Sequence, residues 1–269
     1  MTLAALLVGA ATAEIGLAAI MTGAWGVQRL TGASGWIDAI WTFGVGALGV
    51  ALALGFGASG DGASWRVGMV AIFAAAWSPR LGLHIVARTI KAGDDPRYRK
   101  LMQDWGKAGP RRLLAFLQVQ ALVGAILALA VGLAAAAPGA GLRGRDAIGA
   151  LLFVAALVGE AAADAQIARF KSDPANRGKI CEVGIWRRSR HPNYFFEWLT
   201  WVAFAILALG AHWMGCLALP APALMYWTLR YGSGVPLLED HMLASRGGAF
   251  RSYQARTPIF FPRLRPRWR

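Results

Sequence analysis

Long apolar stretches, separated by short polar or glycine-rich connectors, dominate the pattern of this chain. A helix needs about 20 mostly apolar residues to cross the hydrocarbon core of a bilayer. Seven apolar runs divide the sequence, and the last is too short to cross unaided: 3–28, 36–57, 65–88, 113–136, 147–168, 194–219 and 221–232. Glycine or proline lies at most of the breaks between them. The pattern predicts an all-α, polytopic membrane bundle of about seven transmembrane helices.

The composition agrees with a membrane protein. Hydrophobic residues make up 57% of the chain and charged residues only 16%, whereas soluble domains are about 45–50% apolar and about 25% charged. The net charge of +14 would suggest nucleic acid in a soluble protein. Here Lys and Arg gather in three segments between or after apolar runs, so we expect membrane lipids as partners and no nucleic acid: 91–112, 169–190 and 246–269.

The positions of these cations predict the orientation of the chain. Cytoplasmic loops carry an excess of Lys and Arg. If the three basic segments are cytoplasmic, the loops alternate correctly for seven crossings, with the N-terminus outside and the C-terminus in the cytoplasm. A re-entrant 221–232 segment would reverse the side of the C-terminus.

Several kinds of catalytic site have no sequence signature here. Cys181 and Cys216 lie in a basic loop and in an apolar run, so they offer neither a disulfide framework nor metal-ligand spacing. The chain also has no HExxH or GxSxG motif and no glycine-rich phosphate loop after a strand. We therefore expect no metal site, and hydrolytic and metal-dependent chemistry lose most of their support.

The segment 187–201, RRSRHPNYFFEWLTW, combines a dense cationic and hydrogen-bonding cluster with the start of an apolar helix. Polar groups at a membrane span are costly and commonly serve a site. Arginine and lysine bind phosphates, while Asn193 and Glu197 could hydrogen-bond a carboxamide or a ribose and Tyr194 could stack on a ring. The segment predicts a site for an anionic cofactor that acts on a lipid-soluble substrate.

Ionisable residues inside the spans are the candidates for a proton donor. Glu14 is balanced between a buried helix–helix hydrogen bond and a substrate-pocket acid, and Asp38 between a site and an interfacial position. Glu160 and Asp164 share one helix face, where a salt-bridge network is the alternative to ligand binding. His84 is our choice of proton donor, because arginines four residues before and after it would keep it able to act near neutral pH.

Four blocks of the chain resemble one group of membrane proteins. GIWRRSRHPNYFFEWLTW is similar to the signature of the steroid 5α-reductase-like proteins, specifically the bacterial branch called DUF1295. Three further blocks, IDAIWTFG, RLGLHIVARTIKAGDDPRYRKLMQDWG and SGVPLLEDHMLASRGGAFRSYQARTPIFFP, resemble other parts of the same pattern. Together they cover most of the chain from Trp36 onward, in the expected order.

The resemblance implies a seven-helix fold that holds NADPH among its last helices and loops and delivers hydride to an electron-poor carbon–carbon double bond. It implies a single membrane domain, 1–269, with substrate-side helices in 1–110 and cofactor-binding elements in 111–269. A multi-pass protein of the bacterial inner membrane, with its cofactor site facing the cytoplasm, is the corresponding expectation. By similarity, the cofactor-binding residues are Asp164, Lys171, Arg190, His191, Asn193, Tyr194, Glu197, Glu239, Arg97 and Arg99.

The chain departs from the pattern at two points. Phe196 stands where the family usually has glycine before the glutamate. The Gln–Glu pair that steroid reductases use beside the substrate carbonyl is absent from the first spans, which puts a steroid substrate in doubt. Glu14, Asp38 or His84 would then supply a different acid.

Three functions remain open. The leading hypothesis is an NADPH-dependent reductase of an enone-like lipid. Isoprenylcysteine methyltransferases are similar over the RHPNY segment and use S-adenosylmethionine, which carries no phosphate, so the abundance of arginine favours NADPH. The third alternative is a lipid-binding protein without catalysis. It accounts for the cationic loops but not for Asn193, Tyr194 and Glu197.

Overall fold

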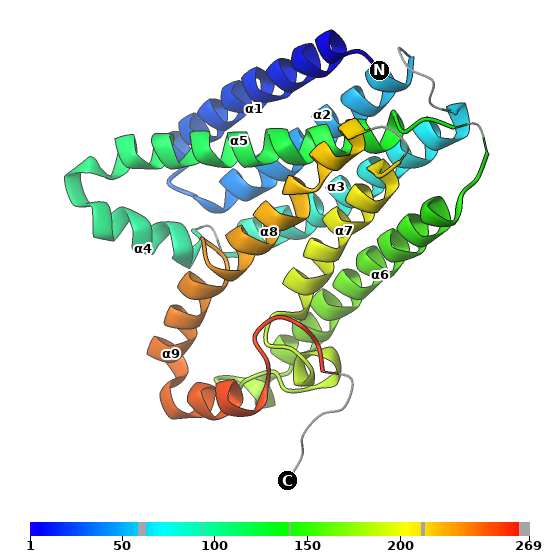
Figure 1. Ribbon diagram of the computed structural model, residues 1–269. Helices are drawn as coiled ribbons and strands as arrows, with labels where there is room; N and C mark the ends of the chain where they lie inside the picture. Colours follow the sequence, from blue (N-terminus) through cyan, green and yellow to red (C-terminus); the bar gives the residue numbers. More distant parts are fainter. Residues whose placement is uncertain (59–62, 93, 140, 211–212, 264–269) are drawn as a thin grey trace. The chain divides into compact units, whose positions relative to one another are not determined.

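The computed structural model of the protein describes residues 1–58, 63–92, 94–139, 141–210 and 213–263. Within these ranges the chain forms nine α-helices and four short 3-10 helices and has no β-strand (Figure 1). The α-helices are α1 (Leu3–Thr31), α2 (Gly35–Ala58), α3 (Ser64–Ala92), α4 (Pro96–Trp105), α5 (Gly109–Ala135), α6 (Gly144–Ser172), α7 (Pro192–Ala208), α8 (Pro220–Arg230) and α9 (Val235–Arg256). The predicted all-α polytopic bundle is confirmed, and each of the seven apolar runs overlaps an α-helix.

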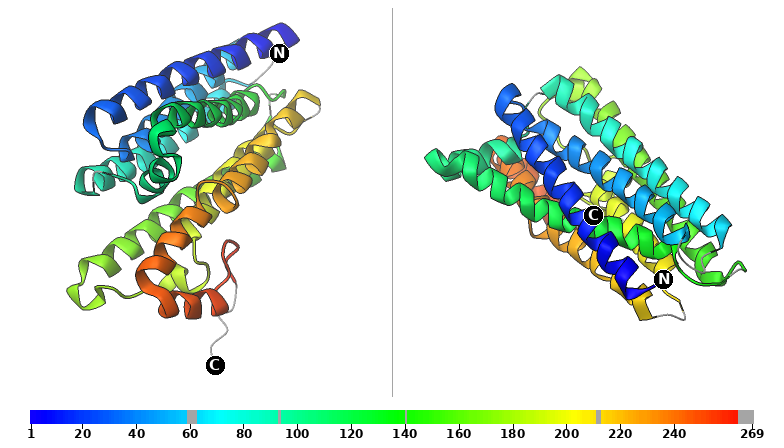
Figure 2. Two further views of the ribbon diagram at one scale, coloured as in Figure 1. Left: turned by 90° about the vertical axis from the view of Figure 1, so that its left-hand side faces the viewer. Right: turned by 90° about the horizontal axis from the view of Figure 1, so that it is seen from above.

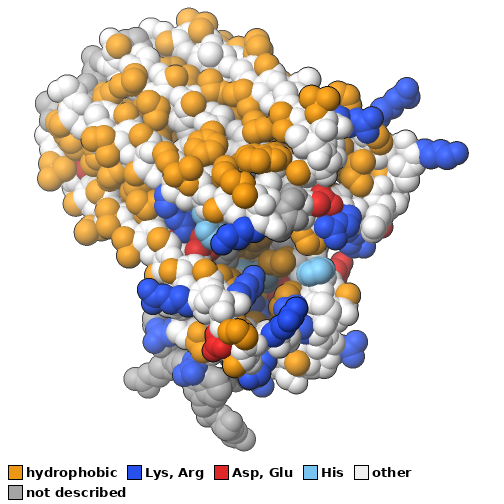
Figure 3. All heavy atoms as spheres, turned by 180° about the vertical axis from the view of Figure 1, so that it is seen from behind, with side chains coloured by type: hydrophobic (Ala, Val, Ile, Leu, Met, Phe, Trp, Pro, Cys, Tyr) orange, Lys and Arg blue, Asp and Glu red, His pale blue; other side chains and the backbone are white. Residues whose placement is uncertain are grey.

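Five helical segments of the described chain are long and apolar enough to cross a membrane: Leu3–Thr31, Gly35–Ala58, Ser64–Lys91, Pro96–Ala135 and Gly144–Ser172. Large apolar side chains on them, such as Ile15 and Ile72, are strongly exposed, and Figure 3 shows the broad hydrophobic surface of the molecule. Such a surface is suited to lipid. The protein is therefore an integral membrane protein, while the direction in which it crosses stays a prediction.

The sixth predicted run, 194–219, is divided between two elements. α7 ends at Ala208 after 17 residues, and a 3-10 helix, η4 (Trp213–Ala218), precedes α8. α8 has 11 residues and begins at Pro220, in the position where proline is best tolerated in a helix. Of the basic segment 246–269, residues 246–263 belong to the described chain.

The chain divides into two compact units. Unit 1 contains Met1–Ala150 and Trp201–Leu224, and unit 2 contains Leu151–Thr200 and Met225–Arg269. The division falls inside α6, α7 and α8, each of which contributes residues to both units. This structural division does not coincide with the functional division expected from the sequence, into 1–110 and 111–269. The functional division stays a prediction.

In unit 1, α2 packs against α3 and α5, and α1 packs against α5 and α2 (Figure 2). Small residues permit these close approaches. A Cβ atom added to Gly46 of α2 would collide with Ser78 of α3, whose hydroxyl donates to the Thr42 carbonyl at 3.2 Å. The Trp41 indole donates to the Gln120 carbonyl of α5 at 2.9 Å, so polar contacts as well as apolar packing fix this core.

A fully buried ion pair joins the start of α3 to the start of α6. Arg66 Nη2 lies 2.9 Å from Asp146 Oδ2, and both side chains have no exposed surface. The other guanidinium nitrogen of Arg66, Nη1, donates to the carbonyls of Ala137 and Gly139 at 2.8 and 2.9 Å. A buried charge is costly unless it is paired and hydrogen-bonded. Arg66 meets both conditions and thereby fixes the connection between α5 and α6.

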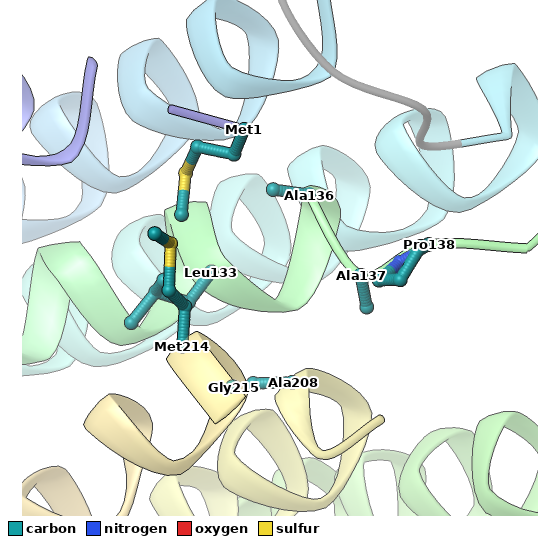
Figure 4. A pocket seen from close by; sticks show the side chains of 8 residues that line it. All are labelled: Met1, Leu133, Ala136, Ala137, Pro138, Ala208, Met214 and Gly215. Carbon is teal, nitrogen blue, oxygen red and sulfur yellow. The ribbon is translucent and has the colours of Figure 1, made fainter. Parts of the chain in front are cut away.

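A small cavity of about 60 Å³ lies in unit 1 near this end of α5. The side chains that line it are apolar, and those of Met1 and Met214 enter it (Figure 4). None of the candidate site residues lines it.

In unit 2, α9 and the segment that follows it pack against the loop between α6 and α7. α9 bends at Gly247, whose φ of 49° and ψ of −119° lie outside the helical region. Glycine accepts positive φ without a Cβ penalty. Beyond α9, Phe260 and Phe261 pack edge-on against Trp198 of α7 with ring centroids 6.1 and 5.5 Å away, so the end of the described chain is held in unit 2.

Candidate functional site

The loop before α7 is anchored to α6 by two hydrogen bonds. The Trp186 indole donates to the Ala163 carbonyl at 2.8 Å, and the Ile185 amide donates to Gln166 Oε1 at 2.9 Å. Trp186 belongs to a 3-10 helix, η3 (Gly184–Arg187), and its side chain is buried. The RHPNY segment therefore begins from a fixed position on α6.

The segment after α9 forms a second support for the same loop. Ser189 Oγ donates to the Phe260 carbonyl at 2.8 Å, and the Arg190 amide donates to the Pro258 carbonyl at 2.9 Å. The Arg263 amide donates to the Arg188 carbonyl at 3.0 Å. These contacts hold the backbone of residues 188–190 between α6 and the end of the described chain.

Glu239 of α9 lies at the centre of the polar contacts in unit 2. Its Oε1 accepts hydrogen bonds from Arg190 Nε at 2.7 Å and His191 Nε2 at 2.9 Å. Its Oε2 accepts from Arg190 Nη2 at 3.2 Å and from Gln254 Nε2 at 2.7 Å. Arg190 Nη1 donates in addition to the carbonyls of Gln254 and Thr257 at 3.0 and 2.8 Å. The Glu239 carboxylate and the Arg190 guanidinium thus have a hydrogen-bond partner at each of their polar atoms. We name Arg190, His191, Glu239 and Gln254 the Glu239 cluster.

Electrostatics in the Glu239 cluster favour an ionised glutamate and a neutral histidine. Burial alone raises the pKa of Glu239, but its hydrogen bonds with His191, Arg190 and Gln254 outweigh burial and lower the pKa to about 2. Burial lowers the pKa of His191 below 6.5, and Glu239 opposes this shift only in part. At neutral pH the pair is therefore a carboxylate hydrogen-bonded to an uncharged imidazole.

The first turn of α7 adds aromatic and polar groups beside this cluster. The rings of His191 and Tyr194 are stacked, with centroids 5.5 Å apart and planes inclined by 16°. Asn193 and Tyr194 are partly exposed, and Glu197 is buried one turn further on. The structure thus brings together Arg190, His191, Tyr194 and Glu239.

The candidate residues of α6 occupy one helix in unit 2. Asp164 and Glu160 are both buried, with relative exposures of 7% and 3%, as their spacing on one helix face predicts. Lys171, in the last turn of α6, is exposed. Among the described residues, no group of three or more His, Cys, Asp or Glu side chains could hold a metal ion.

Two further candidates, Asp38 and Arg97, are ion-paired in unit 1. Arg97 Nη2 pairs with Asp38 Oδ2, and Arg97 also donates twice to Asp95, at 3.0 and 2.9 Å. The hydroxyl of buried Tyr98 donates to Asp38 Oδ1 at 2.7 Å and accepts from Gln120 Nε2 at 3.2 Å. Asp38 of α2 and Arg97 and Tyr98 of α4 form one connected cluster, which Gln120 joins to α5.

Asp95 supports this cluster as the N-cap of α4. Its side chain accepts the Arg97 amide at 2.9 Å, ahead of Pro96 at the first helical position. Burial alone would raise the pKa of Asp95, but bonds from Arg97 and the charge of Arg88 lower it. Arg99, the other expected phosphate contact, pairs instead with Asp94 at 2.9 Å.

Glu14 and His84 are in different surroundings. Glu14 lies on α1 with its Oε2 buried, and that atom has no hydrogen-bond partner among the described residues. His84 is exposed on α3. Nothing in the structure tests the roles proposed for them, which stay predictions.

Sequence reasoning did not single out Tyr98, Asp95 or Gln254. The Asp-Pro pair at 95–96 is a recognisable helix start, so Asp95 could have been found as a cap. Tyr98 and Gln254 carry no such signal, because their partners lie 60 and 15 residues away in the sequence. Their roles depend on the fold.

Residues 24–257 match the model of a family described as "Protein of unknown function (DUF1295)". The chain belongs to the DUF1295 family. The matched region contains every candidate residue named above except Glu14. Both the Glu239 cluster and the Asp38–Arg97–Tyr98 cluster therefore lie within the DUF1295 region.

One curated relative of this DUF1295 protein is "Uncharacterized protein C594.04c" of Schizosaccharomyces pombe (strain 972 / ATCC 24843). The two are 30% identical over 104 residues, which cover 36% of this chain and 28% of the relative. No solved structure matches the chain. The family is thus established, whereas the activity has to be argued from the residues.

Proposed function

We propose that this DUF1295 protein is an NADPH-dependent reductase that adds hydrogen across the carbon–carbon double bond of an enone-like lipid. The observation that carries the proposal is the arrangement at the start of α7. There a stacked His191–Tyr194 pair, fixed by the Glu239 cluster, stands beside Asn193 in a chain that is otherwise strongly apolar. A planar, hydrogen-bonding group suits such a site, and an integral membrane protein has direct access to lipid substrates.

The residues of unit 2 fit a nicotinamide nucleotide in chemical type. The Tyr194 ring offers a stacking surface, amide and carboxylate groups offer partners for a carboxamide or ribose, and exposed cations suit phosphate. We assign these roles to Tyr194, Asn193, Glu197, Asp164 and Lys171. NADPH, when bound, supplies the hydride. Arg190, His191 and Glu239 would hold the start of α7 in place.

A proton must accompany the hydride. In the proposed reaction hydride is added to the β carbon, and a proton that is replenished from water is added to the α carbon or the carbonyl oxygen. The reduced lipid and NADP⁺ leave, so both electrons of the hydride are accounted for.

Transfer of a methyl group from S-adenosylmethionine is the second candidate, and one observation favours it. Arg190 pairs with Glu239 and donates to two carbonyls, so its guanidinium is already engaged. Arg97 and Arg99 are likewise paired with aspartates. A sulfonium cofactor has no phosphate to bind and would not need these arginines.

Calorimetric titration of the detergent-purified protein with NADPH, NADH and S-adenosylmethionine separates the two candidates. NADPH should bind most tightly, and Asn193→Ala and Glu197→Gln should each weaken it by roughly tenfold, the value of one buried hydrogen bond. Asp104→Asn, which alters an exposed pair with Lys100, is the matched control. Binding of S-adenosylmethionine alone would favour the methyltransferase, and no binding of any of the three would reject both.

Activity is tested in the same preparation. Incubation with NADPH and a panel of enone-bearing lipids should oxidise the cofactor and yield a product two hydrogen atoms heavier by mass spectrometry. If NADPH binds but is not oxidised in the presence of any of the enones, the cofactor site is established and the proposed reduction is rejected.

A further inference from the structure

The Glu239 cluster constrains the position of the proton on His191. An ionised carboxylate accepts hydrogen bonds and cannot donate them. Because His191 Nε2 lies 2.9 Å from Glu239 Oε1, the hydrogen between them has to be on Nε2. Three other donor contacts, two from Arg190 and one from Gln254, reach the same carboxylate, so it has no need of a proton of its own.

The surroundings of His191 exclude a second proton. The residue is 4% exposed, and the charged groups that act on it are Glu239 of α9, Arg190 of the loop and Arg230 of α8. The two arginines disfavour a positive imidazolium, as does burial, and the single carboxylate does not reverse their effect. A neutral imidazole with its proton on Nε2 carries a lone pair on Nδ1.

The Nδ1 atom has no hydrogen-bond partner among the described residues, because the imidazole contacts of His191 there are Glu239 and the stacked ring of Tyr194. Stacking fixes the plane of the imidazole, and the bond to Glu239 fixes its rotation in that plane. The lone pair of Nδ1 therefore points in one defined direction. Nδ1 is not among the fully buried side-chain atoms that lack a partner, so it keeps some exposed surface at which a ligand can supply the donor.

We infer that Glu239 is a positioning residue that sets the tautomer of His191, and that Nδ1 of His191 accepts a hydrogen bond from an N–H or O–H group of the bound nucleotide. This inference rests on the proposed function for the identity of the ligand, but not for the tautomer. The two donors that a nicotinamide nucleotide offers are its carboxamide N–H and its ribose hydroxyls. Gln254, which donates to Glu239, is part of the same support.

The tautomer is tested in the ligand-free protein by NMR after labelling histidine with ¹⁵N. The chain has four histidines, and His191→Gln assigns the signal. At neutral pH the wild type should show a protonated Nε2 and an unprotonated Nδ1. In Glu239→Gln the amide can either donate or accept, so the Nδ1–H tautomer should become populated. Glu182→Gln, which alters an exposed pair with Arg256, should leave the spectrum unchanged.

The acceptor role is tested with two replacements of His191. His191→Gln can keep the bond to Glu239 but places no acceptor near Nδ1, whereas His191→Asn places a carbonyl oxygen near Nδ1 and loses Glu239. NADPH affinity should fall roughly tenfold in His191→Gln and clearly less in His191→Asn. Thermal unfolding of both variants shows that each is folded. An analogue with acetylpyridine in place of nicotinamide lacks the amide N–H. If the wild type binds this analogue more weakly than NADPH, by the same factor as His191→Gln weakens NADPH, the donor is the carboxamide. If the wild type binds both equally well, the donor is a ribose hydroxyl.

The outcomes separate this inference from the proposed function. A wild-type Nδ1 that carries a proton, or an imidazolium at neutral pH, would overturn the inference even if NADPH binds. Equal NADPH affinities of the two His191 variants would overturn the acceptor role. If NADPH does not bind at all, the proposed function and the acceptor role both fail, and the NMR result still decides what Glu239 does.

Discussion

The ring of Phe196 on α7 lies directly against Gly159 on α6. A Cβ atom added to Gly159 would be 2.5 Å from Phe196 Cδ1, far inside van der Waals contact. Phe196 is the position at which the chain departs from the DUF1295 signature by lacking glycine. The small residue that this helix contact requires is therefore supplied by the opposite helix, and close packing of α6 and α7 is kept.

Gly159→Ala should destabilise the protein by about 1–3 kcal/mol, the usual cost of overpacking a filled contact. Phe196→Ala removes the ring that the new methyl group meets, so the double variant should recover most of the loss caused by Gly159→Ala. Thermal or denaturant unfolding in detergent measures the four proteins of this double-mutant cycle.

Gly23→Ala in α1 is the matched control, because a Cβ atom there meets nothing within 4 Å. It should be neutral or slightly stabilising. Additive effects of Gly159→Ala and Phe196→Ala would show that the two residues do not interact.

The pattern of apolar runs was sufficient for the helices but not for their ends. All seven runs overlap α-helices, because apolar length is a local property of the sequence. The run 194–219 contains the end of α7 at Ala208, although its composition continues to be apolar. Ends of this kind depend on tertiary packing, and on glycines such as Gly215, which contacts the Ala208 carbonyl so closely that no Cβ would fit.

The candidate site shows the same limit. Sequence similarity placed Arg190, His191 and Glu239 near each other, but not the ion pair that joins them over 49 residues. Similarity placed Arg97 at the cofactor, and Asp38 was singled out separately as an acid in a span. The sequence does not show that these two residues, 59 positions apart, pair with each other. Charge can be counted from the sequence, but its pairing follows from the fold.

Asp146→Asn should be strongly destabilising. It leaves the Arg66 guanidinium fully buried without its counter-charge, and loss of one partner of a buried pair costs about 3–5 kcal/mol. The two carbonyls that also accept from Arg66 cannot replace a negative charge. Unfolding of the purified variant in detergent measures the loss.

Asp104→Asn serves as the control for that variant. Its partner Lys100 is 3.5 Å away, and both side chains are about half exposed, so its effect should stay below about 1 kcal/mol. A similarly small effect of Asp146→Asn would contradict the structural role of the buried pair.

Tyr98→Phe should destabilise the protein by about 1–3 kcal/mol, because a buried polar atom that loses its hydrogen-bond partner costs about that much. The variant removes only the hydroxyl that donates to Asp38 Oδ1 at 2.7 Å. Thermal or denaturant unfolding of the purified variant in detergent measures the loss. An unchanged unfolding transition would show that this hydroxyl does not stabilise the cluster around Asp38.

The stability contributed by Glu239 should depend on pH in a defined window. Its pKa is about 2 in the folded protein against an ordinary value of 4.5. Its stabilisation is therefore complete above pH 4.5 and is lost as the pH falls from 4.5 toward 2. His191 also makes the protein less stable as the pH falls, but at a higher pH. Because its pKa is lowered from 6.5 in the folded protein, below pH 6.5 the unfolded chain binds a proton that the folded protein does not, and this favours unfolding.

Glu239→Gln separates these two contributions. Without Glu239 the imidazole of His191 loses the one group that favours its charge, so the difference in melting temperature between wild type and variant should hold or widen from about pH 7 to about pH 5. Below pH 4.5 the wild type loses the stabilisation by Glu239 and the difference should narrow. Other carboxylates titrate in both proteins and cancel in the comparison. A difference that stays constant down to pH 3 would mean that the Glu239 carboxylate is not held by Arg190 and His191 in the folded protein.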